Sequence, residues 1–367
     1  MTLFTDEKRI SLNITGEVTV LSPISVTRPD DNFVSGTGTK NKPRLPRAGV
    51  KKDGTMPFIP GSSFRGGLRR AARDCVRNLT GEQFDLATTY MLTQGVDITN
   101  AMIAQKSAGS IGLEEPLRKK NPFLSLFGAW SLPGHTGVGD LIPSEPDCVF
   151  TAGGGVRTNE FIRDPKQIQF LTPEDAEKLE KIIMDDSVTA SEVGDLKKEI
   201  TDLKAQMREV RDKEVKAALQ EQVAHVEAMI KAKKGEKSGS TETIQRPLEG
   251  YEAIAPGTVL HHRLPLTMVN SMEMALFLES LAKYAKNPVI GGHKNHACGY
   301  FSAQYSISYW PEDEDQPREV AVIRFDETGF FIEGEAAGEL QALRKEFKSS
   351  VKNGDFDFTA FLFSQAE

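Results

Sequence analysis

One stretch of the chain combines a helix start with a row of cations. Residues 57–70 read Pro-Phe-Ile-Pro-Gly-Ser-Ser-Phe-Arg-Gly-Gly-Leu-Arg-Arg. The prolines and the first glycine end the preceding segment, and Ser62 or Ser63 offers a side-chain oxygen that can cap a helix. Free amides at Gly61, Ser62 and Ser63, together with the helix dipole, favour an anion such as phosphate. Arginines then recur at every fourth position, which places them on one helix face: Arg65, Arg69, Arg73 and Arg77.

The other face of this predicted helix is apolar, with Phe64, Leu68 and Cys75, and we expect it to dock on a sheet. Taken alone, the arginine row is equally typical of a solvated face on an ordinary helix. The rest of the chain has to decide between the two interpretations.

The segment before this helix is rich in glycine and in basic residues. Between Arg28 and Arg77 the chain has twelve lysines and arginines against four acidic residues. That local net charge of +8 leaves −15 for the rest of a chain whose total is −7. A basic region on an acidic body suits a directed interaction with nucleic acid, although a plain surface loop is the alternative. The loop residues expected to close over a phosphodiester backbone are Arg28, Lys40, Lys42, Arg44 and Arg47.

Two further loops carry candidate binding residues. A glycine run at 153–155 precedes Arg157 and Phe161, a cation and an aromatic ring that could separate or stack on bases. A glycine-bounded loop at 290–300 presents a polar tip that we expect to face nucleic acid: His293, Lys294, Asn295 and His296. The two histidines and Cys298 lack a second ligand pair, so we expect neither a metal site nor another cofactor. A histidine acting as general base in RNA cleavage stays open as an alternative.

The elements that must position these residues follow from periodicity. Alternating apolar residues predict strands over 10–26, 259–264 and 301–309 and a hairpin over 320–332. Helical spacing predicts a helix after Ser63, another over 271–286 and one at the C-terminal end. Residues 121–130 form a compact apolar segment. This order predicts an α+β fold, a ferredoxin-like or RRM-like palm with elaborations.

Residues 172–234 differ from the rest, with apolar positions stepping by four and three among lysines and glutamates. This pattern predicts a helical hairpin or coiled-coil arm inserted in the palm. We therefore expect a first half of the palm over 1–165, the hairpin insertion over 166–245 and a second half over 246–367. A scaffold whose hairpin is the main interaction element is a further alternative, but it leaves the concentrated positive charge unexplained.

Composition favours a cytoplasmic protein. The three cysteines, Cys75, Cys148 and Cys298, lie far apart and give no disulfide framework, which fits a reducing compartment. No signal peptide opens the chain and no apolar run reaches membrane-spanning length, so no membrane partner is expected.

Three stretches together resemble the CRISPR-associated RAMP superfamily. Residues 56–66 look like that family's proline–glycine–serine–serine helix start, Leu126-Phe127-Gly128 resembles its leucine–phenylalanine–glycine signature, and residues 290–300 are similar to its C-terminal glycine-rich loop. The chain looks most like the repeated backbone subunit of class 1 effector complexes. The opening at residues 22–29 is similar to the type IV version in particular, with the type III backbone subunit next.

The resemblance implies an RRM-like palm with helical fingers and a thumb-like loop. It also implies a role in antiviral defence, in which copies of the chain assemble as a helical filament along the guide RNA (crRNA) and leave its bases free to pair. The implied partners are the guide RNA, a target nucleic acid (DNA in preference to RNA), further copies of the chain and other effector subunits. The positions that match the RNA-gripping helix start are Gly61, Ser62, Ser63 and Arg65.

One departure bears on catalysis. Target-cleaving type III relatives carry an aspartate in the loop before this helix, where the present chain has Asn41, which cannot act as a carboxylate base. We therefore expect no catalytic residue. A RAMP-type endoribonuclease that processes guide RNA or cleaves target RNA is the main alternative.

Overall fold

The structure is a computed structural model. It describes residues 2–4, 8–26, 44–49, 55–96, 111–129, 132–153, 155–157, 166, 169, 171–209, 213–235, 246–248, 250–311 and 313–361. The chain divides into two compact units, unit 1 with Met1–Ala152 and Tyr251–Glu367, and unit 2 with Gly153–Gly250.

Unit 1 is built on an antiparallel sheet with the predicted first strand at its centre. Strand β1 (Ile10–Val20) pairs along most of its length with β11 (Phe301–Tyr309), from Leu12 opposite Tyr309 to Val20 opposite Phe301. The sheet order is β13-β12-β11-β1-β9-β4, and β10 pairs with the start of β1. The remaining strands are β4 (Ile142–Pro143), β9 (Val259–Arg263), β10 (Leu266–Val269), β12 (Arg318–Asp326) and β13 (Gly329–Glu333).

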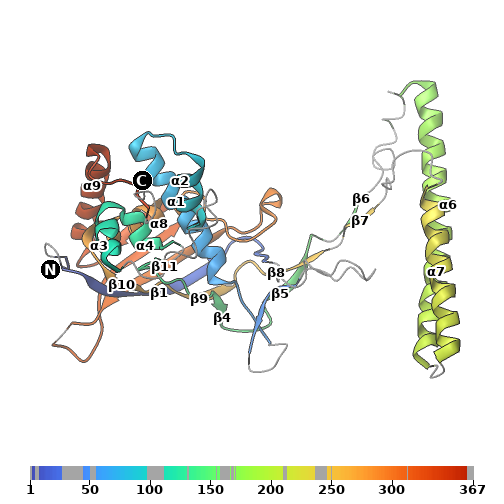
Figure 1. The fold of residues 1–367 in the computed structure, drawn as a ribbon, viewed down its shortest axis with the longest axis horizontal. Helices are drawn as coiled ribbons and strands as arrows, with labels where there is room; N and C mark the ends of the chain where they lie inside the picture. Colours follow the sequence, from blue (N-terminus) through green and yellow to red (C-terminus); the bar gives the residue numbers. More distant parts are fainter. Residues whose placement is uncertain are drawn as a thin grey trace. The chain divides into compact units, whose positions relative to one another are not determined.

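The helices of unit 1 lie on one side of this sheet (Figure 1). Helix α1 packs against α8, and in chain order β1, α1, β4, β9, α8 and β11 form the β-α-β-β-α-β arrangement of a ferredoxin-like fold. The predicted α+β class and ferredoxin-like palm are therefore confirmed. The helices are α1 (Gly61–Thr80), α2 (Leu86–Gln94), α3 (Ile111–Lys120), α4 (Pro122–Phe127), α8 (Ser271–Tyr284) and α9 (Ala337–Asn353).

Alternation in the strands and the apolar face of α1 supply the core. In β1, Ile14 and Val18 are fully buried, and Phe64 and Leu68 of α1 are fully buried opposite them in the same cluster. The apolar face of α1 therefore docks as its spacing predicts. Two short pairs complete unit 1, β2 (Arg47–Ala48) with β3 (Met56–Pro57) and β5 (Val149–Ala152) with β8 (Tyr251–Ile254).

Unit 2 contains the predicted helical hairpin. Helix α6 (Pro173–Glu209) packs along α7 (Lys213–Gly235), and Val193, Val223 and Val226 are buried in the seam. Exposed ion pairs between Lys204 and Glu227 and between Lys233 and Glu192 follow the antiparallel register of the two helices. A two-stranded pair, β6 (Gly155–Arg157) with β7 (Arg246–Leu248), belongs to the same unit.

Candidate nucleic-acid interface

The start of α1 is capped by a carboxylate from another part of the chain. Pro60 occupies the N-cap position, so the predicted serine cap is wrong, and the Gly61 amide donates a 2.8 Å hydrogen bond to Oδ1 of Asp140. A Cβ at Gly61 would lie 2.4 Å from the carbonyl oxygens of Val138 and Gly139, so only glycine allows this close approach. The expected phosphate contact of the Gly61 amide is corrected accordingly, because Asp140 already holds that donor.

The two serines that follow Gly61 differ in their exposure to solvent. Ser62 is exposed, and its amide has no hydrogen-bond partner among the described residues. Ser63 is half-buried and its amide donates to the carbonyl of Pro60 at 2.9 Å. Ser62 is therefore the residue of this first turn best placed to meet an anion.

The arginine row is divided between the interior and the surface. Arg69 is 5% exposed, and its guanidinium donates to the carbonyls of Met91, Leu92, Phe127 and Gly128 at 2.7–3.1 Å. Burial and then the charge of Arg65 lower the pKa of Arg69 to about 9, which keeps it charged at neutral pH. The prediction that Arg69 supplies charge to RNA is wrong, because its donors cap the C-terminal ends of α2 and α4.

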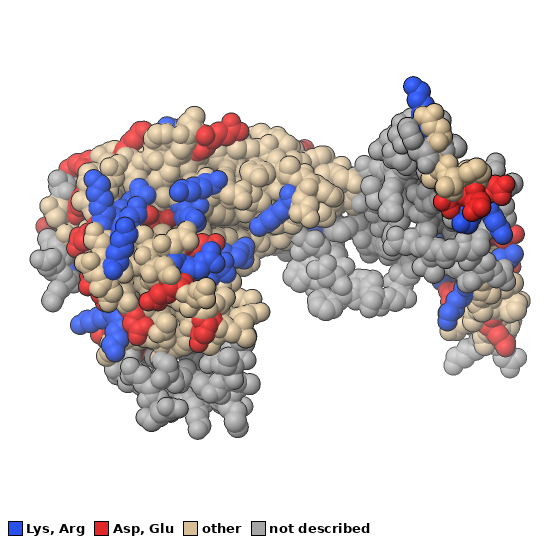
Figure 2. Space-filling view, turned by 90° about the horizontal axis from the view of Figure 1, so that it is seen from above, with Lys and Arg blue, Asp and Glu red and all other residues tan. Residues whose placement is uncertain are grey.

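The other arginines of α1 have different surroundings. Arg65 is exposed and gives one hydrogen bond to the carbonyl of Phe127. Arg73 is paired with Asp74 at 2.8 Å and donates to the Thr93 hydroxyl, so it is less available to RNA than predicted. Arg70, which the four-residue spacing passes over, is exposed and makes no hydrogen bond or ion pair with any described residue. Figure 2 views the helix side of unit 1 and shows lysines and arginines interleaved with acidic residues.

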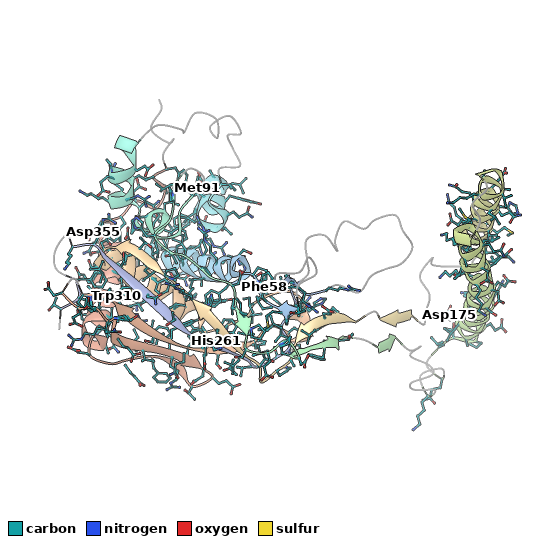
Figure 3. All side chains as sticks on the ribbon, turned by 90° about the horizontal axis from the view of Figure 1, so that it is seen from below. Phe58, Met91, Asp175, His261, Trp310 and Asp355 are labelled. Atoms are coloured by element: carbon teal, nitrogen blue, oxygen red, sulfur yellow. The ribbon has the colours of Figure 1, made fainter. Side chains whose placement is uncertain are left out.

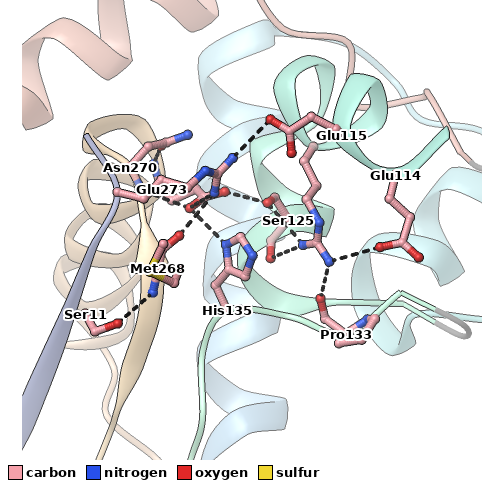
Figure 4. Close-up of polar contacts among 11 residues, drawn as sticks. Ser11, Glu114, Glu115, Ser125, Pro133, His135, Met268, Asn270 and Glu273 are labelled. Carbon is pink, nitrogen blue, oxygen red and sulfur yellow. Dashed lines mark hydrogen bonds and ion pairs between the residues drawn. The ribbon is translucent and has the colours of Figure 1, made fainter. Parts of the chain in front are cut away.

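Hydrogen bonds tie the Leu126-Phe127-Gly128 segment to a second segment that crosses it. The amides of His135 and Thr136 donate to the carbonyls of Ser125 and Leu126. Both segments are anchored on the fully buried carboxylate of Glu273, which accepts hydrogen bonds from Ser125 and His135 and lies 3.5 Å from Arg9 (Figure 4). Burial raises the pKa of Glu273, but these hydrogen bonds outweigh it and hold that pKa below its ordinary value.

An open pocket of about 800 Å³ lies beside the first half of α1. Its lining comes from three parts of the chain that the sequence separates widely: α1, the end of α2 and the crossing after α4. Arg65 and Arg70 are its exposed cations, so the pocket is where unit 1 brings the predicted helix start and the Leu-Phe-Gly signature together. Asp140 and Arg70 were missed by sequence reasoning, because no local spacing distinguishes either of them.

The C-terminal glycine-rich loop closes on the chain itself. Gly291 and Gly299 have positive φ values of 84° and 96°, and a Cβ there would meet the carbonyl oxygens of Ser25 and Ile290 at 2.4 and 2.3 Å. The amide of Gly292 also donates to Ser25 at 2.9 Å. These glycines therefore allow the close approach of the protein's own backbone.

The tip of that loop is exposed, as required for contact with a partner. His293, Lys294, Asn295 and His296 are all exposed, around the short helix η4 (Lys294–His296). The His293 ring stacks on Tyr251 with centroids 3.6 Å apart and lies 6.1 Å from the ring of His296. Burial and the charge of His296 lower the pKa of His293. In the described part of the chain, no group of three or more His, Cys, Asp or Glu side chains is placed to hold a metal ion.

The remaining predicted residues are placed as follows. Arg47 is half-buried and forms a 3.0 Å ion pair with Glu252, so it braces β8 and is not the open cation we expected. Arg44 is exposed. Arg157 lies in β6 of unit 2 opposite Arg246. Four of the predicted residues lie outside the described residues: Arg28, Lys40, Lys42 and Phe161.

The open side of the sheet, which faces away from the helices (Figure 1), differs from the helix side in the side chains that it presents. The side chains that β1 and β11 present there are polar, with Thr15, Glu17 and Thr19 beside Ser302, Gln304 and Ser306. His261 of β9 lies on this side opposite Glu17 (Figure 3). RNA-binding sheets of the RRM type carry aromatic rings at these central positions, on which bases stack. Among the described residues, those that β1 and β11 place on this face therefore provide no aromatic stacking platform.

No protein-family model matches the chain, and no curated protein matches it either. Among solved structures, a chain of a "Type IV-B CRISPR Complex" is similar with a TM-score of 0.41 and 16% sequence identity, over 84% of the present chain and 96% of that chain. None of the helices that the structure describes has the length and apolar character needed to cross a membrane.

Proposed function

We propose that this protein is a non-catalytic guide-RNA-binding subunit of a class 1 CRISPR effector complex, most like the type IV backbone subunit. The observation that carries the proposal is the junction of two family-like motifs. Arg65 and Arg69 of the helix start bind the carbonyl of Phe127 in the Leu-Phe-Gly signature, and this junction forms one wall of a pocket with exposed cations.

In the proposed complex, the RNA backbone follows the first half of α1. Ser62, Arg65 and Arg70 are exposed there and supply donors and charge to phosphates. Contacts of this kind position a strand without reading its sequence, as a guide of variable sequence requires. The bases then stay free to pair with a target, for which we propose DNA in preference to RNA.

The other predicted residues extend this interface. We propose that RNA or a neighbouring copy contacts the exposed loop tip at His293–His296, Arg157 with Phe161, and four basic residues before α1: Arg28, Lys40, Lys42 and Arg44. On the basis of the same resemblance, we propose that copies of the chain repeat along the guide RNA and contact other effector subunits.

Cleavage of RNA is the second candidate function, and the histidine pair favours it. His293 and His296 are both exposed with rings 6.1 Å apart, and two histidines can serve as general base and general acid in RNA cleavage. We propose the non-catalytic role because Tyr251 stacking holds the His293 ring against the protein.

The test is to produce the chain together with a CRISPR array and its neighbouring genes, purify it at moderate salt and sequence the bound nucleic acid. The proposal expects guide-length RNA, protected from nuclease at regular intervals. A protein that carries no RNA would contradict it. RNA ends cut at one fixed position, and lost in both His293→Ala and His296→Ala, would establish the endoribonuclease.

A further inference from the structure

The two ends of the strand order in unit 1 are built differently. At one end, β4 has two residues, and one of them is Pro143, which has no N–H to offer. Very short edge strands and prolines are devices that keep a sheet from pairing with another chain. At the other end, β13 reads Gly-Phe-Phe-Ile-Glu, with neither proline nor lysine, and no bulge interrupts its register with β12. The β13 edge therefore lacks the protection that the β4 edge has.

The backbone of β13 has hydrogen-bonding groups to spare. A two-residue turn precedes this strand, so Asp326 and Gly329 are a hydrogen-bonded pair. Hydrogen-bonded and non-hydrogen-bonded pairs alternate in an antiparallel ladder, which turns the amides and carbonyls of Phe330 and Ile332 away from β12. In the described part of the chain, β13 makes no backbone hydrogen bond outside its pairing with β12. A further strand can use these groups.

The side chains along this edge favour an apolar segment. Phe330 and Phe331 are half-buried, and as neighbours in a strand they point to opposite faces of the sheet. On the helix side, a groove of about 730 Å³ is lined by Phe330 together with Pro288 and the exposed side chains of Leu21 and Tyr300. Apolar side chains on the helix side of an added strand would extend this surface and cover the Phe330 ring.

Acidic side chains lie at both ends of the edge. Glu327 in the turn and Glu333 at the end of β13 are exposed, and neither has an ion pair among the described residues. The β13 strand of a second copy, paired antiparallel, would bring Glu333 of each copy to the end where Glu327 of the other lies, and like charges so placed are unfavourable. A segment with a lysine or arginine at each end is attracted instead.

We propose that β13 binds an extended segment of another protein by strand addition, a segment that is apolar on one face and carries a lysine or arginine at each end. Its backbone pairs with Phe330 and Ile332, and its cations lie beside Glu327 and Glu333. The groove at this edge shares no lining residue with the pocket beside α1. The proposal therefore adds a protein-binding site that does not depend on RNA.

Synthetic peptides test the proposal. The complete chain, freed of nucleic acid by nuclease and high salt, is titrated into fluorescein-labelled Lys-Thr-Ile-Thr-Ile-Thr-Lys, and fluorescence anisotropy reports binding. We expect this peptide to bind, and Glu-Thr-Ile-Thr-Ile-Thr-Glu to bind about tenfold more weakly. Methylation of both isoleucine amides of the lysine peptide should abolish binding, because the added strand loses its donors. No binding of the lysine peptide, or equal binding of its methylated form, would overturn strand addition.

Charge reversal in the protein locates the site. Glu327→Lys with Glu333→Lys should weaken binding of the lysine peptide about tenfold and strengthen binding of the glutamate peptide by a similar factor. Glu145→Lys is the matched control, because Glu145 is exposed just after β4 at the other edge, and it should leave both affinities unchanged. Equal affinities in all three proteins would overturn the site. A dimer in sedimentation velocity that the lysine peptide dissociates would make a second copy the occupant and overturn the assigned partner.

Discussion

Arg69 and Arg70 are adjacent in α1 but have opposite surroundings. Arg69 is buried with four carbonyl partners, whereas Arg70 is exposed with none among the described residues. Replacing Arg69 by methionine should lower the free energy of unfolding by about 3 kcal/mol or more, because buried carbonyls lose their donors. Urea unfolding measures this. Arg70→Met, the matched control, should change stability by less than about 0.5 kcal/mol, and equal losses for both would contradict the structure.

The buried position of His262 predicts that the free energy of unfolding falls as the pH is lowered. It is buried, hydrogen-bonded to Tyr305 and to the carbonyl of Gly139, and burial lowers its pKa to about 4. In the unfolded chain the pKa is about 6.5, so between these values the unfolded state binds more protons and stability is lost as the pH falls. Unfolding free energy should drop by about 2 kcal/mol from pH 7.5 to 5.0 through this residue. In His262→Gln the free energy of unfolding should depend less on pH. A pH dependence equal to that of the unmodified chain would refute this role of His262.

At the scale of elements, the glycine-rich loop offers a matched pair of substitutions. Gly291 has a positive φ and no room for a Cβ, whereas the nearest atom to a Cβ on Gly292 lies 3.9 Å away. Gly291→Ala should therefore destabilise unit 1 by about 2–3 kcal/mol, and Gly292→Ala by less than 1 kcal/mol. Thermal unfolding of the two variants compares them. Similar melting temperatures for both would show that the loop does not close on Ser25.

We expect that the helical hairpin of α6 and α7 does not contribute to the retention of RNA. Val226 is 3% exposed in the seam of α6 and α7. Val226→Asp should lower helicity in circular dichroism through a buried unpaired charge, yet leave the amount of copurified RNA unaltered. Loss of RNA together with helicity would make the hairpin part of the interface and favour the scaffold alternative.

The elements were more predictable than the site. Alternation in residues 10–20 and the signals around Pro60 and Gly61 specify β1 and α1, because local periodicity and backbone chemistry decide them. The Asp140 cap and the carbonyl partners of Arg69 join residues far apart in the sequence. Spacing alone predicts a solvated arginine, since arginine is seldom fully buried, and only the tertiary arrangement shows otherwise.

At the scale of the whole molecule, charge has to be concentrated for an acidic chain to hold RNA. The net charge is −7, and the basic region between Arg28 and Arg77 opposes it. Only part of this positive charge faces solvent, because Arg47 and Arg73 are paired and Arg69 is buried. The charges left at the start of α1 are those of Arg65 and Arg70, and they should set how RNA binding responds to salt.

The most direct test is the salt dependence of RNA affinity for the unmodified chain, for Arg65→Gln with Arg70→Gln, and for Arg77→Gln. Arg77 is exposed in the last turn of the same helix and lies 3.5 Å from Asp74. For single strands the slope of log affinity against log salt is about 0.7 per phosphate contact. We predict weaker binding and a slope smaller by about 1.4 for the double variant, with Arg77→Gln close to the unmodified chain. Equal slopes for all three proteins would contradict the claim that the start of α1 grips the RNA backbone.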